Sequence, residues 1–265
     1  MQRETTGARH SIQAILTGLA DTGCGLLDTL LTRLIARNCA AQARTRATQG
    51  AYVDGPTLRA LPAARPASVL AAAPRDTTRS YGTAGLIAHP RAPLAVFDRP
   101  GGRAFAQLRT TLAGGEAWLP VIAQQADWIQ ILLPSQPAGS VGWVDAARVT
   151  LAHSRHEIRI LVTAHRAQLV FAGRITKSWP VTCGTPDTPT PPGRTFVLAV
   201  TRDTRRRPDP IVLPLAVPSR HAGCGAHGVI ALHTGPPHAG CITVPPAALP
   251  ALARAPLGSL VRIYP

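Results

Sequence analysis

The chain has 265 residues and a formal net charge of +15, with 28 Lys+Arg against 13 Asp+Glu. Apolar residues make up 45% of it, enough for a real hydrophobic core, which excludes a wholly disordered chain. Aromatic residues make up only 4%, which argues against a nucleic-acid platform built on base stacking. A basic excess of this size is typical of proteins that meet a polyanion, although GC-rich codon usage, which favours arginine, produces it as well.

The first half of the chain is predicted to form three successive segments. Leucine and isoleucine recur at helical spacing within residues 11–38, so we expect N-terminal amphipathic helices over residues 1–40. Residues 41–90 are rich in Ala and Pro without a sustained period, which predicts a linker. Residues 91–151 hold short β-rich segments separated by Gly, Pro, Ser and Asp, which favours a small β-barrel.

The second half, residues 156–265, again consists mostly of short predicted strands, with one helix expected near residues 246–255. The fold class is therefore predicted to be mostly β. No apolar run reaches the roughly 18 residues of a membrane span, so no integral membrane span is expected. The N-terminus makes a poor secretory signal because Glu4 lies in its basic region.

Side chains capable of metal binding or nucleophilic attack concentrate in one stretch of 21 residues. Carboxylates are scarce around it: beyond Leu151 the acids are Glu157, Asp187, Asp203 and Asp209. A paired-carboxylate mechanism is therefore disfavoured, which leaves Cys-His nucleophilic catalysis or a Cys/His metal site. The residues of this stretch are His221, Cys224, His227, His233, His238 and Cys241.

The Cys-His interpretation rests on the apolar segment 229–232. His233 follows this segment directly, and a turn then leads to Cys241. A neighbouring imidazole activates a thiol by lowering its pKa or taking its proton. A backbone carbonyl, with that of Thr234 as the candidate, would orient the imidazole. The amides around Gly240 and Cys241 could then form an oxyanion hole.

The metal interpretation uses the repeated sequence His-Ala-Gly-Cys at residues 221–224 and 238–241. Cys224 with His227, and His238 with Cys241, would supply two ligand pairs for a tetrahedral zinc ion. His233 would then have no role. The five cysteines are an odd number, which leaves at least one free thiol.

The segment 179–197, Trp-Pro-Val-Thr-Cys-Gly-Thr-Pro-Asp-Thr-Pro-Thr-Pro-Pro-Gly-Arg-Thr-Phe-Val, resembles the hallmark of L,D-transpeptidases with a YkuD-like catalytic domain. The order that follows is similar too: a strand ending in His, then Gly-Cys-Ile, a helix and a closing strand. The resemblance covers about residues 156–264. Segments 128–134 and 142–144 also resemble the SH3-like module that precedes this domain in some members. Two positions depart from the family pattern, with Ala239 in place of His and Thr243 in place of Arg.

The resemblance implies a β-sandwich-like catalytic domain at 156–265 behind an SH3-like β module at 91–151. It implies a peptidoglycan L,D-transpeptidase of the cell envelope that acts on stem peptides within an anionic cell wall and is a target of carbapenems. Cys241 would be the nucleophile and His233 the base, with Gly240, Thr234 and His238 at the substrate or oxyanion. No cofactor, metal or nucleic acid is expected. The alternatives are a catalytically inactive wall-binding protein of the same fold and a Cys/His zinc-binding module.

Strand geometry distinguishes two candidate bases, His233 and His227. Alternate side chains of a strand face opposite sides, so Ile230 and Leu232 are predicted to face the core. His233 would then lie on the more open face, at the strand end nearest Cys241. His227 lies six residues earlier, roughly 20 Å away along an extended chain, so it is the alternative base.

Overall fold

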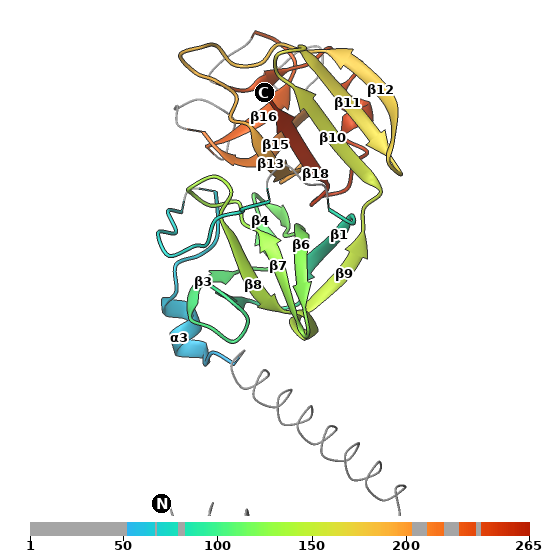
Figure 1. Cartoon of the computed structure of the whole chain (residues 1–265). Helices are drawn as coiled ribbons and strands as arrows, with labels where there is room; N and C mark the ends of the chain where they lie inside the picture. Colours follow the sequence, from blue (N-terminus) through green and yellow to red (C-terminus); the bar gives the residue numbers. More distant parts are fainter. Residues whose placement is uncertain (1–51, 67, 79–82, 203–210, 220–227, 237–239) are drawn as a thin grey trace, which may run out of the picture. The chain divides into compact units, whose positions relative to one another are not determined.

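The structure is a computed structural model that describes residues 52–66, 68–78, 83–202, 211–219, 228–236 and 240–265. These residues belong to one compact unit, residues 47–265, in which strands far outnumber helices, and this confirms the predicted mostly-β fold class (Figure 1). The helices predicted over residues 1–40 lie outside the described residues. Within the described ranges, no helix has the length and apolar character needed to cross a membrane.

A seven-stranded sheet occupies the first half of the unit, in the order β3-β2-β8-β7-β6-β1-β9. All of its pairings are antiparallel. Most side chains of β2 and β7 are buried, and the sheet encloses a core that includes Val96, Leu119 and Ile131. Its strands are β1 (Leu86–Pro90), β2 (Leu94–Phe97), β3 (Ala104–Leu108), β6 (Leu119–Gln125), β7 (Trp128–Leu132), β8 (Val141–Asp145) and β9 (Val149–His153).

Short elements connect these strands. A two-stranded hairpin, β4 (Thr111–Leu112) with β5 (Gly115–Glu116), links β3 to β6. A 3-10 turn, η1 (Ala146–Arg148), leads from β8 into β9, and the Asp145 side chain caps it by accepting a hydrogen bond from the amide of Ala147. The sheet begins at Leu86 and ends at His153, so it is longer at both ends than the module predicted at 91–151.

The stretch predicted as a linker is ordered in its described part, in contrast to the prediction. Helix α3 (Gly55–Ala60) begins at Asp54, whose side chain accepts a hydrogen bond from the amide of Thr57. Ala64 and Leu70 are buried in the core of the seven-stranded sheet, and their amides donate to the carbonyls of Gln107 and Gln136. Such single bridges follow neither a helical nor a strand period, which explains why the sequence pattern missed them.

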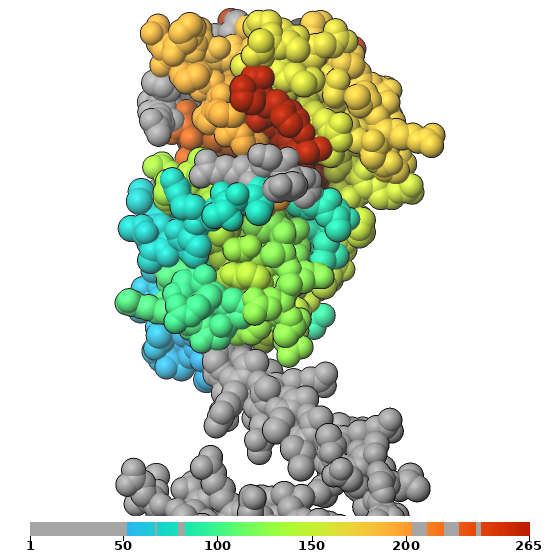
Figure 2. Space-filling view, in the orientation of Figure 1, coloured from blue at the N-terminus to red at the C-terminus, as the bar shows by residue number. Residues whose placement is uncertain are grey.

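Two further sheets make up the second half. The first has the order β12-β11-β10-β18-β13, and the second has the order β14-β15-β16-β17. Exposed side chains, including Ile175 at 52%, line the edge strand β12, which lies at the surface in yellow in Figure 2. The strands are β10 (His156–Leu161), β11 (Arg166–Phe171), β12 (Arg174–Pro180), β13 (Gly193–Phe196), β14 (Thr201–Arg202), β15 (Ile211–Pro218), β16 (Val229–His233), β17 (Ile242–Thr243) and β18 (Leu260–Tyr264).

The two sheets pack face to face, which confirms the predicted β-sandwich. One core cluster combines Ile158 and Val261 of the five-stranded sheet with Leu213, Leu232 and Ile242 of the four-stranded sheet. Helix α4 (Leu249–Leu252) closes this core with Leu249 and Leu252, both fully buried. Its position agrees with the helix predicted at 246–255, although only one turn is regular.

A buried ion pair joins the stretch before β1 to the sandwich. The Asp76 amide donates to the carbonyl of Gly139 in the β7–β8 connection, while the Asp76 carboxylate accepts two hydrogen bonds from Arg194 of β13, at 2.6 and 2.9 Å. Both side chains are 1% exposed. Burial alone would raise the pKa of Asp76, but hydrogen bonds from Arg194 and Thr78 outweigh it and lower that pKa.

Candidate active site

The candidate nucleophile and base lie on two adjacent parallel strands. Strands β16 and β17 pair with Leu232 opposite Ile242 and His233 opposite Thr243. Cys241, immediately before β17, packs in a small cluster with Ala231 of β16 and Val212 of β15. Because side chains two residues apart on a strand share a face, His233 lies on the same face of β16 as Ala231. The fold therefore brings Cys241 and His233 to one face of the sheet.

The predicted alternation along β16 is confirmed, but the predicted open face is not. Ile230 and Leu232 point into the sandwich core, whereas Val229 and Ala231 belong to other clusters. His233, however, is only 1% exposed, because β16 is an inner strand with both faces covered. The prediction of an open face was therefore wrong.

A hydrogen bond to the main chain fixes the orientation of the His233 ring. Its Nδ1 lies 2.8 Å from the carbonyl oxygen of Thr234, the partner expected from the sequence. A carbonyl oxygen only accepts hydrogen bonds, so Nδ1 carries the proton and donates it. In the neutral ring Nε2 then holds a lone pair, which is the form that a general base requires.

The two described cysteines differ in redox state. Cys241 is disulfide-bonded and 1% exposed, whereas Cys183 is a free thiol buried in the sandwich core. Burial raises the pKa of the Cys183 thiol, so this thiol is a poor nucleophile near neutral pH. Cys183 satisfies the expectation of at least one unpaired cysteine. A disulfide sulfur neither attacks a carbonyl as a thiolate nor binds zinc as one, so any chemistry of Cys241 requires reduction first.

The loop between β12 and β13 lies against the backbone before Cys241. Thr182 and Thr243 exchange two backbone hydrogen bonds, at 3.0 and 2.9 Å. The Thr190 hydroxyl donates to the carbonyl of Gly240 and accepts from the amide of Gly184, both at 2.9 Å. Sequence reasoning assigned Thr190 no role. Its signal was present, since Thr190 begins the Thr-Pro-Pro-Gly part of the segment that resembles the transpeptidase hallmark.

Several candidate residues lie outside the described residues. They include the alternative base His227, the proposed substrate contact His238 and the zinc-ligand candidate Cys224. Within the described ranges, no group of three or more His, Cys, Asp or Glu side chains is arranged to hold a metal ion. The structure therefore leaves the roles of His227 and His238 as sequence predictions.

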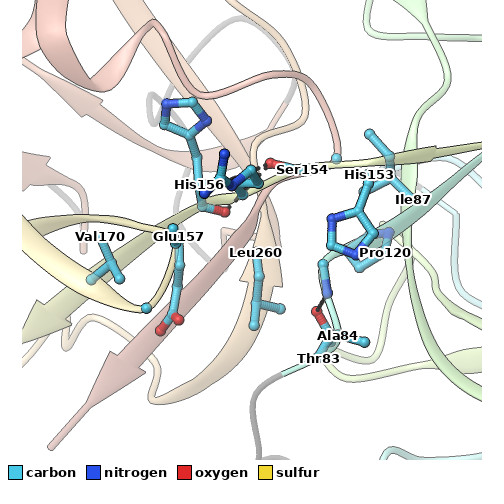
Figure 3. Close-up of a pocket in the computed structure, with 15 residues that line it drawn as sticks. Thr83, Ala84, Ile87, Pro120, His153, Ser154, His156, Glu157, Val170 and Leu260 are labelled. Atoms are coloured by element: carbon cyan, nitrogen blue, oxygen red, sulfur yellow. Dashed lines mark hydrogen bonds between the residues drawn. The ribbon is translucent and has the colours of Figure 1, made fainter.

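A cavity of about 330 Å³ lies where β1 and β6 meet β10, β11 and β18 (Figure 3). Figure 3 shows His153 on one side of this hollow and Glu157 with Val170 on the other. Hydrogen bonds from Arg159 and Arg262 hold the Glu157 carboxylate, and although burial opposes them, they lower its pKa. Neither Cys241 nor His233 lines this cavity, so it is separate from the candidate site.

No family model and no curated protein sequence matches this chain. Among similar solved structures is L,D-transpeptidase 1 of Mycobacterium tuberculosis, 15% identical, covering 47% of this chain and 78% of its own, with a TM-score of 0.34. The L,D-transpeptidase of Mycobacterium smegmatis is 12% identical and covers 75% and 94%, with a TM-score of 0.36. M. tuberculosis L,D-transpeptidase 3, solved with a faropenem-derived adduct, is 13% identical and covers 49% and 75%, with a TM-score of 0.35. All three are L,D-transpeptidases.

Proposed function

We propose that the chain is a cysteine-dependent peptidoglycan L,D-transpeptidase of the cell envelope, with Cys241 as nucleophile and His233 as base. The observation that carries the proposal is the placement of both residues on one face of β16 and β17, with Thr234 holding the His233 ring. Adjacent strands lie about 4.8 Å apart and a two-residue step adds about 6.6 Å, so the two Cα atoms are about 8 Å apart. Cysteine and histidine side chains directed to the same face can meet across such a distance.

The reaction begins once Cys241 is reduced to a thiol. Nε2 of His233 takes the thiol proton, and the sulfur attacks the stem-peptide carbonyl that precedes the terminal D-alanine. Backbone amides around Gly240 and Cys241 stabilise the oxyanion that forms. His233 then returns the proton to the leaving amine of D-alanine, which leaves a thioester on Cys241. An amine of a second stem peptide, or water, attacks the thioester and regenerates the thiol.

Replacing Cys241 with alanine is expected to eliminate the 3→3 cross-links that the enzyme would form. Cells or reactions containing Cys241→Ala should form no 3→3 cross-links above background, because alanine offers no sulfur for the thioester. Muropeptide analysis of the wall measures this, with Cys183→Ala as the matched control because that thiol is buried in the core. Cross-links that persist in Cys241→Ala would contradict the assignment of the nucleophile.

A second candidate function is a catalytically inactive wall-binding protein. The observation that favours it is the disulfide at Cys241, together with a net charge of +15 suited to an anionic wall polymer. In that case the purified protein sediments with isolated wall in a salt-dependent way. After reduction and incubation with a carbapenem, such a protein would form no drug adduct at Cys241, whereas a transpeptidase would.

A further inference from the structure

The hydroxyl of Thr190 joins two backbone groups from different parts of the candidate site. Its Oγ1 lies 2.9 Å from the amide nitrogen of Gly184 and 2.9 Å from the carbonyl oxygen of Gly240. The amide can only donate, so the hydroxyl accepts there and commits its one proton to the Gly240 carbonyl. Thr190 is 4% exposed, which shields both hydrogen bonds from competing water.

Two glycines let the backbones approach this closely. A Cβ at Gly184 would lie 2.1 Å from the carbonyl oxygen of Thr188 and 2.8 Å from the Cα of Gly240. Gly240 has a φ of +74°, which disfavours any L side chain, and a Cβ there would lie 3.1 Å from the carbonyl oxygen of Pro189. The loop 184–190 is therefore packed directly on the peptide unit that precedes Cys241.

Peptide geometry extends this contact to Cys241. The carbonyl of Gly240 and the N–H of Cys241 belong to one planar peptide unit, and in a trans peptide they point in opposite directions. A hydrogen bond that fixes the direction of the carbonyl therefore fixes the direction of the N–H as well. The bridge between Thr182 and Thr243 anchors the chain just beyond Cys241, so this peptide unit is restrained on both sides.

We infer that Thr190 is a positioning residue, whose hydroxyl aims the Cys241 amide N–H at the oxyanion formed during acylation. This inference rests on the proposed function, because it assigns a role within that same reaction. The rate of acyl transfer depends on the direction of this N–H, since hydrogen-bond donors stabilise an oxyanion only when they are already oriented toward it. Alkylation of the thiolate by iodoacetamide forms no oxyanion, so it should be insensitive to the same hydroxyl.

The test compares Thr190→Val, which keeps the shape but loses the hydroxyl, with Thr190→Ser, which keeps the hydroxyl. Both variants and the wild type are first reduced. The rates at which imipenem acylates Cys241 and iodoacetamide alkylates it are then measured separately by mass spectrometry. We expect Thr190→Val to slow imipenem acylation by about 10- to 100-fold. Its iodoacetamide rate should stay within about twofold of the wild type, and Thr190→Ser should restore acylation to within about threefold.

Equal imipenem rates for Thr190→Val and the wild type would overturn the inference while leaving the proposed function intact. So would equal slowing of both reactions accompanied by a lower Tm, since a purely structural role predicts that result. Failure of Thr190→Ser to restore the rate would also overturn it. If the reduced wild type reacts with iodoacetamide but never with imipenem, the proposed function itself is wrong and the role of Thr190 falls with it.

Discussion

Replacing His233 with alanine is expected to abolish acylation of reduced Cys241 by imipenem. The Nδ1 hydrogen bond to Thr234 leaves Nε2 as the basic nitrogen, and alanine removes the acceptor for the thiol proton. General-base catalysis typically contributes about 10²- to 10⁴-fold, so the acylation rate should fall by at least the lower figure. The rate is measured by intact mass spectrometry at pH 7 on protein reduced beforehand.

Two other histidines serve as comparisons. His227→Ala should only slow acylation. Residue 227 lies six residues before His233 in sequence, which is roughly 20 Å along an extended chain, so it is the less direct candidate for the base. His153→Ala, a described histidine that lines the separate cavity, should leave the rate within about twofold of the wild type, as an exposed residue away from the site should. If His227→Ala abolishes acylation and His233→Ala only slows it, His227 is the base.

Asp76→Asn is expected to destabilise the protein by about 3–5 kcal/mol, the usual cost of leaving one member of a buried ion pair uncompensated. Arg194 would keep its charge at 1% exposure and lose a carboxylate that it contacts at 2.6 and 2.9 Å. Urea unfolding of the purified protein measures the change. Asp98→Asn is the matched control, because its pair with Arg99 is exposed and worth at most about 1 kcal/mol.

The contribution of Asp76 should also depend on pH. Its pKa is lower in the folded protein than in the unfolded chain, so ionisation stabilises the fold. The stabilisation is complete above the ordinary aspartate pKa of about 3.9 and is lost as pH falls through the lower, folded value. The Tm difference between wild type and Asp76→Asn should therefore be large at pH 7 and shrink below about pH 4. A difference that stays constant down to pH 2 would contradict this account.

The strand containing His233 was readable from sequence because its signal is local. The alternation in residues 229–233 placed Ile230 and Leu232 in the core. The contact to the Thr234 carbonyl was expected because no acid lies nearby in the sequence to orient the imidazole. The burial of His233, which is 1% exposed, was not readable from the sequence. Periodicity reports which face of a strand is apolar and gives no information on what packs against the other.

Long-range contacts account for the remaining differences. The Asp76–Arg194 pair spans 118 residues, and the Thr190–Gly240 hydrogen bond spans 50. Composition gave residues 41–90 the character of a linker, although Ala64 and Leu70 are core residues. The disulfide at Cys241 was equally hidden, since an odd number of cysteines indicates only that one thiol is left over.

The most direct test of the central claim is the mass of the full-length protein after incubation with imipenem, with and without prior reduction by dithiothreitol. Reduction converts the Cys241 disulfide to two thiols, one of them that of Cys241, while dithiothreitol is oxidised to its own disulfide. The account predicts one imipenem adduct after reduction, mapped by peptide digestion to Cys241, absent in Cys241→Ala and absent without reductant. A reduced protein that gains no adduct at Cys241, or one whose adduct persists in Cys241→Ala, would contradict it.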